Sequence, residues 1–295
     1  MIVNKASLDA LFVAFNMAFQ QGLGMAESQY SKVAMPVPST TAQNTYPWLG
    51  NLPSMREWLG DRVIENLSLH DYTIKNKPFE HTVGVKESDI EDDQHGVYLP
   101  MFKDLGNLAT IHPNQLVFSA LAKGHENPCY DKKPFFSKDH PVGETKASNL
   151  LAPAKDPVAP WFLLHTKRAI LPLIFQRRKD YKLRRMDRPE DENVFMRGEY
   201  LYGVDARVNV GYGLWQLAVR STEPLDADGY AKARSLMASY KDEAGTPLGL
   251  VPNLLVVPAT LESAARKVVV AATAANGATN EWAGSAELLV SPWLA

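Results

Sequence analysis

One segment constrains the fold most, because its pattern describes a structure that is not stable by itself. Two runs of alternating apolar and polar residues, 63–69 and 81–85, flank a turn at His70-Asp71, and together they predict a long two-stranded ribbon. Pro78 cannot donate a ladder hydrogen bond, so we expect the ribbon at a sheet edge or projecting from the body. An isolated ribbon is marginal in water and requires a neighbour.

The residues before this ribbon are predicted to form an arm. Apolar residues recur at helical spacing over 8–19, where Ser7 is suited to the N-cap position, and they predict an amphipathic helix. Asp9 interrupts the apolar run, which is also too short for a membrane span. The stretch 29–46 is rich in Ser, Thr, Asn and Pro without any period, so we expect it to be extended and to lie on another surface.

The rest of the chain mixes helices and strands irregularly. Acidic residues at 87–93 precede an apolar-periodic stretch to Gly124, which predicts a helix with an acidic N-terminus, either kinked or divided at Pro113. Further helices are expected at 230–240 and 261–268, and strands at 161–164, 170–175, 201–204, 214–219, 254–257 and 288–290. This irregular order favours an α+β fold over a doubly wound sheet.

Charge and cysteine content limit the classes of function. A formal net charge of -2 gives no overall attraction to nucleic acid or to an anionic membrane. The single cysteine, Cys129, argues against a disulfide framework and against a cysteine-based metal site, and it fits synthesis in a reducing cytoplasm.

Motifs for common enzyme classes are missing from the sequence. It contains no glycine-rich phosphate loop, no Gly-x-Ser-x-Gly elbow and no His-Glu-x-x-His zinc motif. Cys129 with His140 and Asp139 is the one candidate nucleophile, base and orienter, which leaves a cysteine-dependent hydrolase as an alternative, although a buried cysteine and a His-Pro turn explain these residues better. The acidic group 87–93 lacks calcium-site spacing, so no catalytic, cofactor or metal residues are predicted.

The basic segment 177–188 supports a second alternative, a nucleic-acid-binding protein. Its cations are interleaved with Tyr181 and Leu183, as in segments that follow a phosphate backbone. Acidic residues 190–192 follow directly, and opposite charges this close more often form a solvated strand face or salt bridges between subunits.

A dozen short motifs, in the same order along the chain, resemble the major head subunits of Mu-like phages. They include Ser28-Gln29-Tyr30, Trp48-Leu49-Gly50, Asn76-Lys77-Pro78-Phe79-Glu80, Pro128-Cys129-Tyr130-Asp131, Val194-Phe195-Met196 and Gly211-Tyr212-Gly213-Leu214-Trp215-Gln216. The resemblance covers most of the chain, and it leaves out 143–157 and 270–284.

Membership would imply a Hong Kong 97-like coat fold. Its parts would be an N-terminal arm (1–55), an extended loop (56–86), the spine helix region of a peripheral domain (87–124), and further peripheral and axial segments (125–295). The function implied is a major capsid protein that self-assembles as hexamers and pentamers into the icosahedral shell around the phage genome.

The resemblance also implies partners and a location. These are a scaffolding protein during assembly, a portal, a decoration protein in some heads, and packaged DNA without sequence-specific contact, in a virion assembled in the bacterial cytoplasm. Some coat proteins of this fold crosslink a lysine of the extended loop to a neighbour's asparagine, but no motif here carries that catalysis, so we predict no crosslinking. Intersubunit contacts are expected from Tyr46, Trp48, Trp58, Asp71, Tyr72, Lys75, Lys77, Phe79, Arg177 and Arg184.

Overall fold

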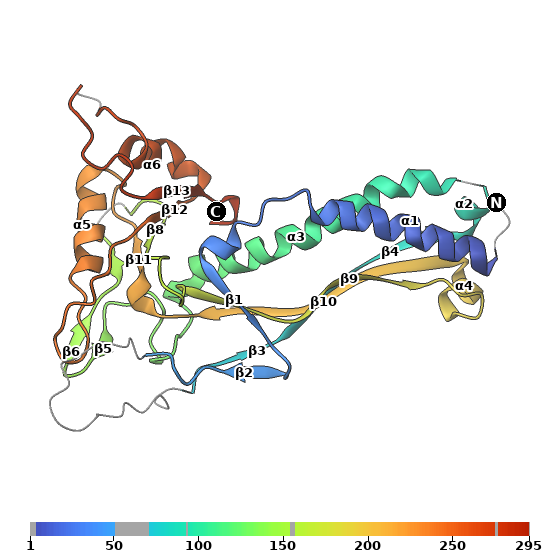
Figure 1. The fold of residues 1–295 in the computed structure, drawn as a ribbon, viewed down its shortest axis with the longest axis horizontal. Coiled ribbons are helices and arrows are strands. Elements are labelled where there is room, and N and C mark those ends of the chain that lie inside the picture. The colour runs from blue at the N-terminus through green and yellow to red at the C-terminus, as the bar shows by residue number, and fades with distance from the viewer. Residues whose placement is uncertain (1–3, 51–70, 93, 154–156, 275–276, 295) are drawn as a thin grey trace.

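The structure is a computed structural model that describes residues 4–50, 71–92, 94–153, 157–274 and 277–294. It has an elongated part, made of long helices and long strands, and a C-terminal part at one end of it (Figure 1). The predicted α+β class is confirmed. None of the helices in the described ranges is long and apolar enough to cross a membrane.

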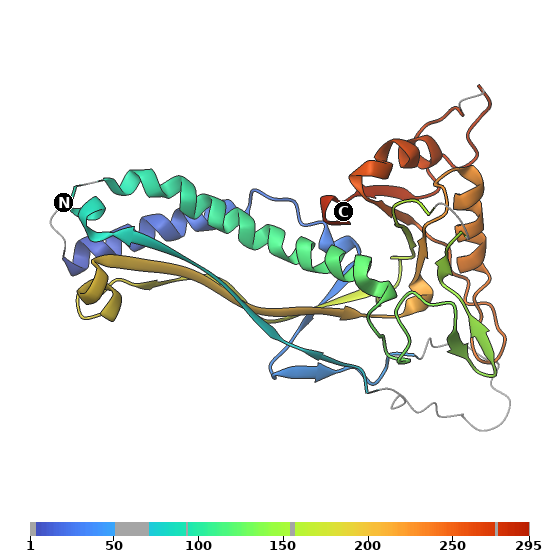
Figure 2. The ribbon, with the colours of Figure 1, turned by 180° about the vertical axis from the view of Figure 1, so that it is seen from behind.

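The elongated part is a twisted four-stranded sheet with two long helices on one face, as Figures 1 and 2 show from opposite sides. The strand order is β1-β9-β10-β4, with β9 and β10 antiparallel, β10 and β4 antiparallel, and β1 parallel to β9. The elements are α1 (Lys5–Leu23), α3 (Leu99–Ala122), β1 (Ala34–Pro38), β4 (Lys77–Lys86), β9 (Leu173–Met186) and β10 (Glu199–Tyr212).

The C-terminal part contains a five-stranded mixed sheet of order β13-β12-β8-β11-β7. Its central strands are short and fully buried, as their unbroken apolar sequences require. The strands are β7 (Leu150–Leu151), β8 (Trp161–Leu164), β11 (Ala218–Ser221), β12 (Leu254–Val257) and β13 (Glu287–Val290), and the helices are α5 (Ala227–Ala238) and α6 (Glu262–Val269).

Short elements connect these two parts and close their ends. Two hairpin-like pairs are formed by β2 (Gln43–Thr45) with β3 (Thr73–Lys75) and by β5 (His140–Val142) with β6 (Thr145–Ala147). The short helices are α2 (Glu87–Glu91) and α4 (Glu192–Arg197), together with 3-10 turns at Tyr30–Lys32, Gln94–Tyr98, Lys123–His125, Trp215–Leu217, Ala259–Leu261 and Pro292–Leu294.

Two separate hydrophobic cores lie along the molecule, and α3 contributes to both. Phe102, Leu105 and Ala109 belong to the core shared with α1, whereas Val117 and Phe118 belong to the larger core of the C-terminal part. Within the predicted spine region, α3 is one continuous helix that includes Pro113. The β10 strand also contributes to both cores. Val204 belongs to the core shared with α1, and Ala206 belongs to the larger core of the C-terminal part.

Several expectations change in the folded chain. The 81–85 run is a strand at the sheet edge, as expected, but β4 pairs with β10 along its whole length, so the described half of the ribbon is part of the subunit body. The partner run 63–69 and its predicted pairing lie outside the described residues. The acidic residues form their own short helix α2, because a 3-10 turn separates them from α3.

The arm also differs in detail from its prediction. Asn4, not Ser7, is the N-cap of α1, since its side chain accepts from the Ser7 N–H while the Ser7 hydroxyl accepts from the Asn4 N–H. The stretch 29–46, expected to be extended, contains the strand β1, whose prolines are tolerated because it is an edge strand. The described arm therefore packs on its own subunit.

Candidate functional site: an assembly surface

Exposed apolar side chains are concentrated on the elongated part. Among the described residues, eleven large hydrophobic side chains are exposed, and nine of them belong to this part. The nine are Val13, Met17, Met25, Val97, Met101, Leu108, Met186, Phe195 and Met196. Large exposed apolar side chains in such number mark a candidate protein interaction surface.

Two of these residues lie on α4, which connects β9 to β10 at the far end of the elongated part (Figure 1). Phe195 is 84% exposed and Met196 is 69% exposed. The helix is held rigidly, because the buried Asn193 amide donates to the carbonyls of Met186 and Glu199 at 3.0 and 2.6 Å. Gly198 then ends the helix in the left-handed conformation. The two apolar side chains are thus presented outward from a fixed base.

Three aromatic residues expected at subunit contacts make contacts within this chain. Tyr46 is buried, and its hydroxyl donates to Gln176 at 2.8 Å. Trp48 is half-buried with its ring edge-on to Tyr46, and the Tyr72 hydroxyl accepts from the Tyr212 N–H at 2.9 Å. The Tyr46 ring is therefore committed to the subunit's own core.

The remaining expected contacts near β3 and β4 are mostly on the surface. Asp71, Lys75 and Lys77 are exposed, while Phe79 is half-buried against the His112 ring of α3 at 4.5 Å. Trp58 lies outside the described residues. Phe79, His112 and Tyr181 line an apolar hollow of about 340 Å³ between α3 and the sheet.

The basic segment 177–188 lies mainly on β9, with cations on its solvent-exposed positions. Four of its seven cations have an acidic partner inside the chain, which agrees with a solvated, charge-paired strand face. The pairs are Arg177 with Asp180, Lys179 and Arg184 with Asp205, and Arg185 with Asp9. Arg177 and Arg184 themselves remain exposed.

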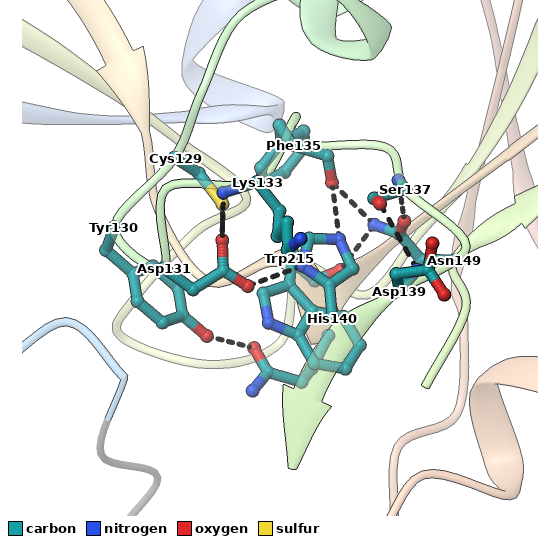
Figure 3. Close-up of polar contacts among 11 residues, drawn as sticks. Cys129, Tyr130, Asp131, Lys133, Phe135, Ser137, Asp139, His140, Asn149 and Trp215 are labelled. Atoms are coloured by element: carbon teal, nitrogen blue, oxygen red, sulfur yellow. Dashed lines mark hydrogen bonds and ion pairs between the residues drawn. The ribbon is translucent and has the colours of Figure 1, made fainter. Parts of the chain in front are cut away.

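The candidate nucleophile Cys129 lies in a buried polar cluster (Figure 3). Its thiol donates to one carboxylate oxygen of Asp131 at 3.1 Å, and the other oxygen lies 2.6 Å from Nδ1 of His140. The prediction that Asp139 orients His140 is wrong, because the Asp139 side chain is exposed and pairs with Lys146. Asp131 replaces it, and it stands between the thiol and the imidazole.

The chemistry of this cluster does not favour a nucleophile. Burial, followed by the negative charge of Asp131, raises the pKa of the Cys129 thiol far above its usual value, so the thiol stays protonated. The His140 ring is completely buried and stacks on Trp215 at 4.2 Å, with the two planes 4° apart. The Asp131 carboxylate bonds to both groups, so the imidazole is not placed to take the thiol proton directly.

Two features of the surface were not recognised from the sequence as contacts. Phe195 and Met196 entered only as part of a resembling motif, although two large apolar residues within a short polar helix are themselves a signal of exposure. Val13 and Met17 are spaced four residues apart on α1, opposite its buried face, and this spacing marks a second apolar stripe.

Comparison with known proteins gives one consistent family. The family model described as Mu-like prophage major head subunit gpT matches residues 8–294. The major capsid protein of Escherichia phage Mu is 41% identical over 305 aligned positions, covering 100% of both chains. The Mu-like prophage FluMu major head subunit of Haemophilus influenzae is 40% identical, covering 88% of this chain and 87% of the relative.

Solved structures agree with the sequence comparison. The subunit of the bacteriophage JBD30 procapsid superposes with a TM-score of 0.88 at 46% identity, covering 99% of this chain and 100% of that one. The subunit of the JBD30 capsid gives a TM-score of 0.82 at 36% identity, with full coverage of both chains. The expected phage coat fold is thereby confirmed. The chain belongs to the family of Mu-like major head subunits, and it is a phage capsid protein, not an enzyme.

Proposed function

We propose that this subunit assembles as hexamers and pentamers into an icosahedral head, and that the elongated part carries most of the contacts between subunits. The observation that supports this is the concentration of exposed apolar side chains there, with Phe195 and Met196 held outward on α4. Such residues are costly in a monomer and stabilising once a neighbour covers them.

Charged residues supply the polar part of the proposed contacts. Asp71, Lys75, Lys77, Arg177 and Arg184 are exposed and available to a neighbouring subunit, with Trp48, Tyr72 and Phe79 contributing partly. Each exposed ion pair is worth less than about 1 kcal/mol. A shell joins many such contacts, and their combined effect exceeds any single one.

The parts of the fold have proposed roles in the shell. We assign the elongated part to the peripheral domain with α3 as its spine, and the C-terminal part to the axial domain. The arm up to residue 55 and the loop from 56 to 86 are proposed to reach neighbours through their exposed residues and through the segment outside the described ranges.

Other partners follow from the same role. We propose a scaffolding protein during assembly, a portal, a decoration protein in the finished head, and packaged DNA inside. A net charge of -2 suits an inner wall that must release DNA during packaging. Because four of the seven cations in 177–188 are paired within the chain, sequence-specific DNA binding is not part of this proposal.

The test uses shells formed by the expressed chain with its scaffold, viewed by electron microscopy. A double substitution, Phe195→Asp with Met196→Asp, should abolish uniform shells while the circular dichroism spectrum of the subunit stays unchanged. Val251→Asp, at an exposed apolar position of the C-terminal part, is the matched control and should assemble. Normal shells from the double variant would rule out this surface, and a wild-type chain that never assembles would argue against the function itself.

A further inference from the structure

The buried cluster around Asp131 brings three metal-ligating side chains together. The ligand atoms Cys129 Sγ, a carboxylate oxygen of Asp131 and a ring nitrogen of His140 all lie within 4.8 Å of one another. Cys129 is 4% exposed as a residue, and the side chains of Asp131 and His140 are 4% and 0% exposed. Neither the shell-building role nor the family comparison uses this cluster.

The hydrogen bonds of His140 leave Nδ1 directed at the cluster. Its Nε2 faces the carbonyl oxygen of Phe135 at 3.3 Å, and a carbonyl can only accept, so Nε2 carries the proton. Stacking on Trp215 fixes the plane of the ring. This is the arrangement of a metal-bound histidine, in which the nitrogen that does not bind the metal donates to a backbone carbonyl.

The Asp131 carboxylate is likewise oriented from outside the cluster. The backbone N–H of Lys133 donates to its Oδ1 at 3.0 Å, which leaves Oδ2 facing Nδ1 of His140. Lys132, at φ 65°, turns the chain sharply here, and both lysines are exposed. The carboxylate therefore lies just beneath the surface, where a cation can reach it.

We propose that Cys129, Asp131 and His140 form a binding site for a divalent transition metal ion, of which Zn²⁺ suits the donor set best. Thiolate, imidazole and carboxylate are the three ligand types of protein zinc sites. Tetrahedral zinc holds its ligand atoms about 3.5 Å apart. The two hydrogen-bonded pairs, at 3.1 and 2.6 Å, must therefore move apart slightly, and the donor atoms that stand up to 4.8 Å apart must move closer. The proposal replaces the expectation that a single cysteine excludes a cysteine-based metal site.

The exchange of protons for metal is balanced in charge. In the hydrogen-bonded cluster the thiol keeps its proton and donates a hydrogen bond to Asp131, and a second proton lies between Asp131 and Nδ1 of His140. Binding of Zn²⁺ displaces both protons to solvent and leaves Cys129 as thiolate, Asp131 as carboxylate and His140 neutral. The total charge of the three side chains plus the metal is zero, as it was before, which suits a buried site.

The metal would act as a structural clamp on the loop that follows α3. Its ligands tie the turn at 129–131 to the start of β5, and His140 passes the constraint to Trp215 beside β11. This role is independent of the subunit contacts on the elongated part.

The test measures bound metal on the full chain, both as free subunits and as shells. Wild-type protein is stripped with a chelator, titrated with Zn²⁺ and freed of unbound metal, and its metal content is determined by mass spectrometry. We expect about one Zn²⁺ per chain, with release of about two protons on binding. Cys129→Ser and His140→Gln should bind at least tenfold more weakly, and the control His125→Gln, at an exposed histidine, should bind like wild type.

A second measurement keeps the test decisive if a variant misfolds. Titration of the stripped wild-type chain with Co²⁺ should produce the absorption of a thiolate-bound cobalt ion. Wild-type protein that retains no Zn²⁺ and shows no such absorption would overturn the proposal, and so would equal binding by folded variants. Electron microscopy of the same samples separates the two ideas, because normal shells from a chain that binds no added Zn²⁺ refute the site and leave the shell-building function intact.

Discussion

Gly106 of α3 lies so close to Phe19 of α1 that a Cβ on the glycine would stand 2.1 Å from the Phe19 carbonyl oxygen. About one turn away, a glycine of α1 approaches the backbone of α3 in the same way. A Cβ on Gly22 would stand 1.9 Å from the carbonyl oxygen of Lys103. The two helices run parallel and touch through their backbones at this point. The rings of Phe15 and Phe102 stack at 4.0 Å next to the contact.

Replacement of either glycine by alanine should separate the helices. In Gly106→Ala the obstacle is backbone, which cannot rotate away, so we expect a loss of about 3 kcal/mol in the free energy of unfolding. This loss would occur although alanine favours a helix by about 1 kcal/mol. Urea unfolding of the dissociated subunit measures it. Gly96→Ala is the control, because its Cβ meets nothing within 4 Å, and equal stability of the two variants would refute the close contact.

Asn114 fastens the arm to α3. Its side-chain oxygen accepts from the N–H groups of Gln29 and Tyr30 at 3.0 and 2.8 Å, and its amide donates to the Glu27 carbonyl at 3.2 Å. Asn114→Ala should cost about 2 kcal/mol, because it leaves three part-buried backbone groups without these partners. Limited proteolysis should then cleave the arm near these residues faster. The exposed neighbour substitution Gln115→Ala should leave the cleavage rate unchanged.

His112 should make the subunit sensitive to mild acid. Burial holds the pKa of this imidazole below its ordinary value of 6.5, and its Nδ1 lies 2.6 Å from the Tyr181 hydroxyl. On acidification the unfolded chain is therefore protonated first. The stability present above about pH 6.5 should be lost as the pH falls toward the folded-state pKa, by at most about 1.4 kcal/mol per pH unit.

The slope of unfolding free energy against pH, taken between about pH 7 and about pH 5, measures this effect. His112→Gln should flatten the slope, whereas His81→Gln, at an exposed position beside the same hollow, should not. An unchanged slope in His112→Gln would assign the acid sensitivity to another group.

Mature heads should contain no covalent multimers. Lys75 and Lys77 are exposed, but no motif that would catalyse an isopeptide bond accompanies them in the sequence. A denaturing gel of purified heads should show a single band at the subunit mass. A ladder that disappears in the double variant Lys75→Arg with Lys77→Arg would contradict the prediction.

Local elements of this fold were largely readable from the sequence, because their signals are local. The apolar runs at 161–164 and 254–257 are the buried strands β8 and β12, and the helical spacing at 230–240 corresponds to α5. The long strands β9 and β10 were predicted as short pieces. Charged residues alternate through their exposed positions, and their continuity is imposed by pairing with each other.

Contacts between segments that are distant in the chain could not be predicted from the sequence. The partner of β4 is β10, more than a hundred residues away, and a periodic pattern specifies a strand without specifying its neighbour. The same limit applies to the candidate surface. The sequence identified Tyr46 as an aromatic contact, but only the fold reveals that its ring is buried, and only the fold places Asp131 next to His140.

The boundary between the two hydrophobic cores has a mechanical consequence. In α3 the boundary falls around Pro113, which lacks the N–H that would complete the helical ladder, and in β10 it falls around Asp205–Val208, where the register with β9 slips. Both α3 and β10 thus have interrupted backbone hydrogen bonding where the two cores meet. The subunit is divided into two well-packed blocks that meet at this level, and a bend confined to it would leave both cores undisturbed.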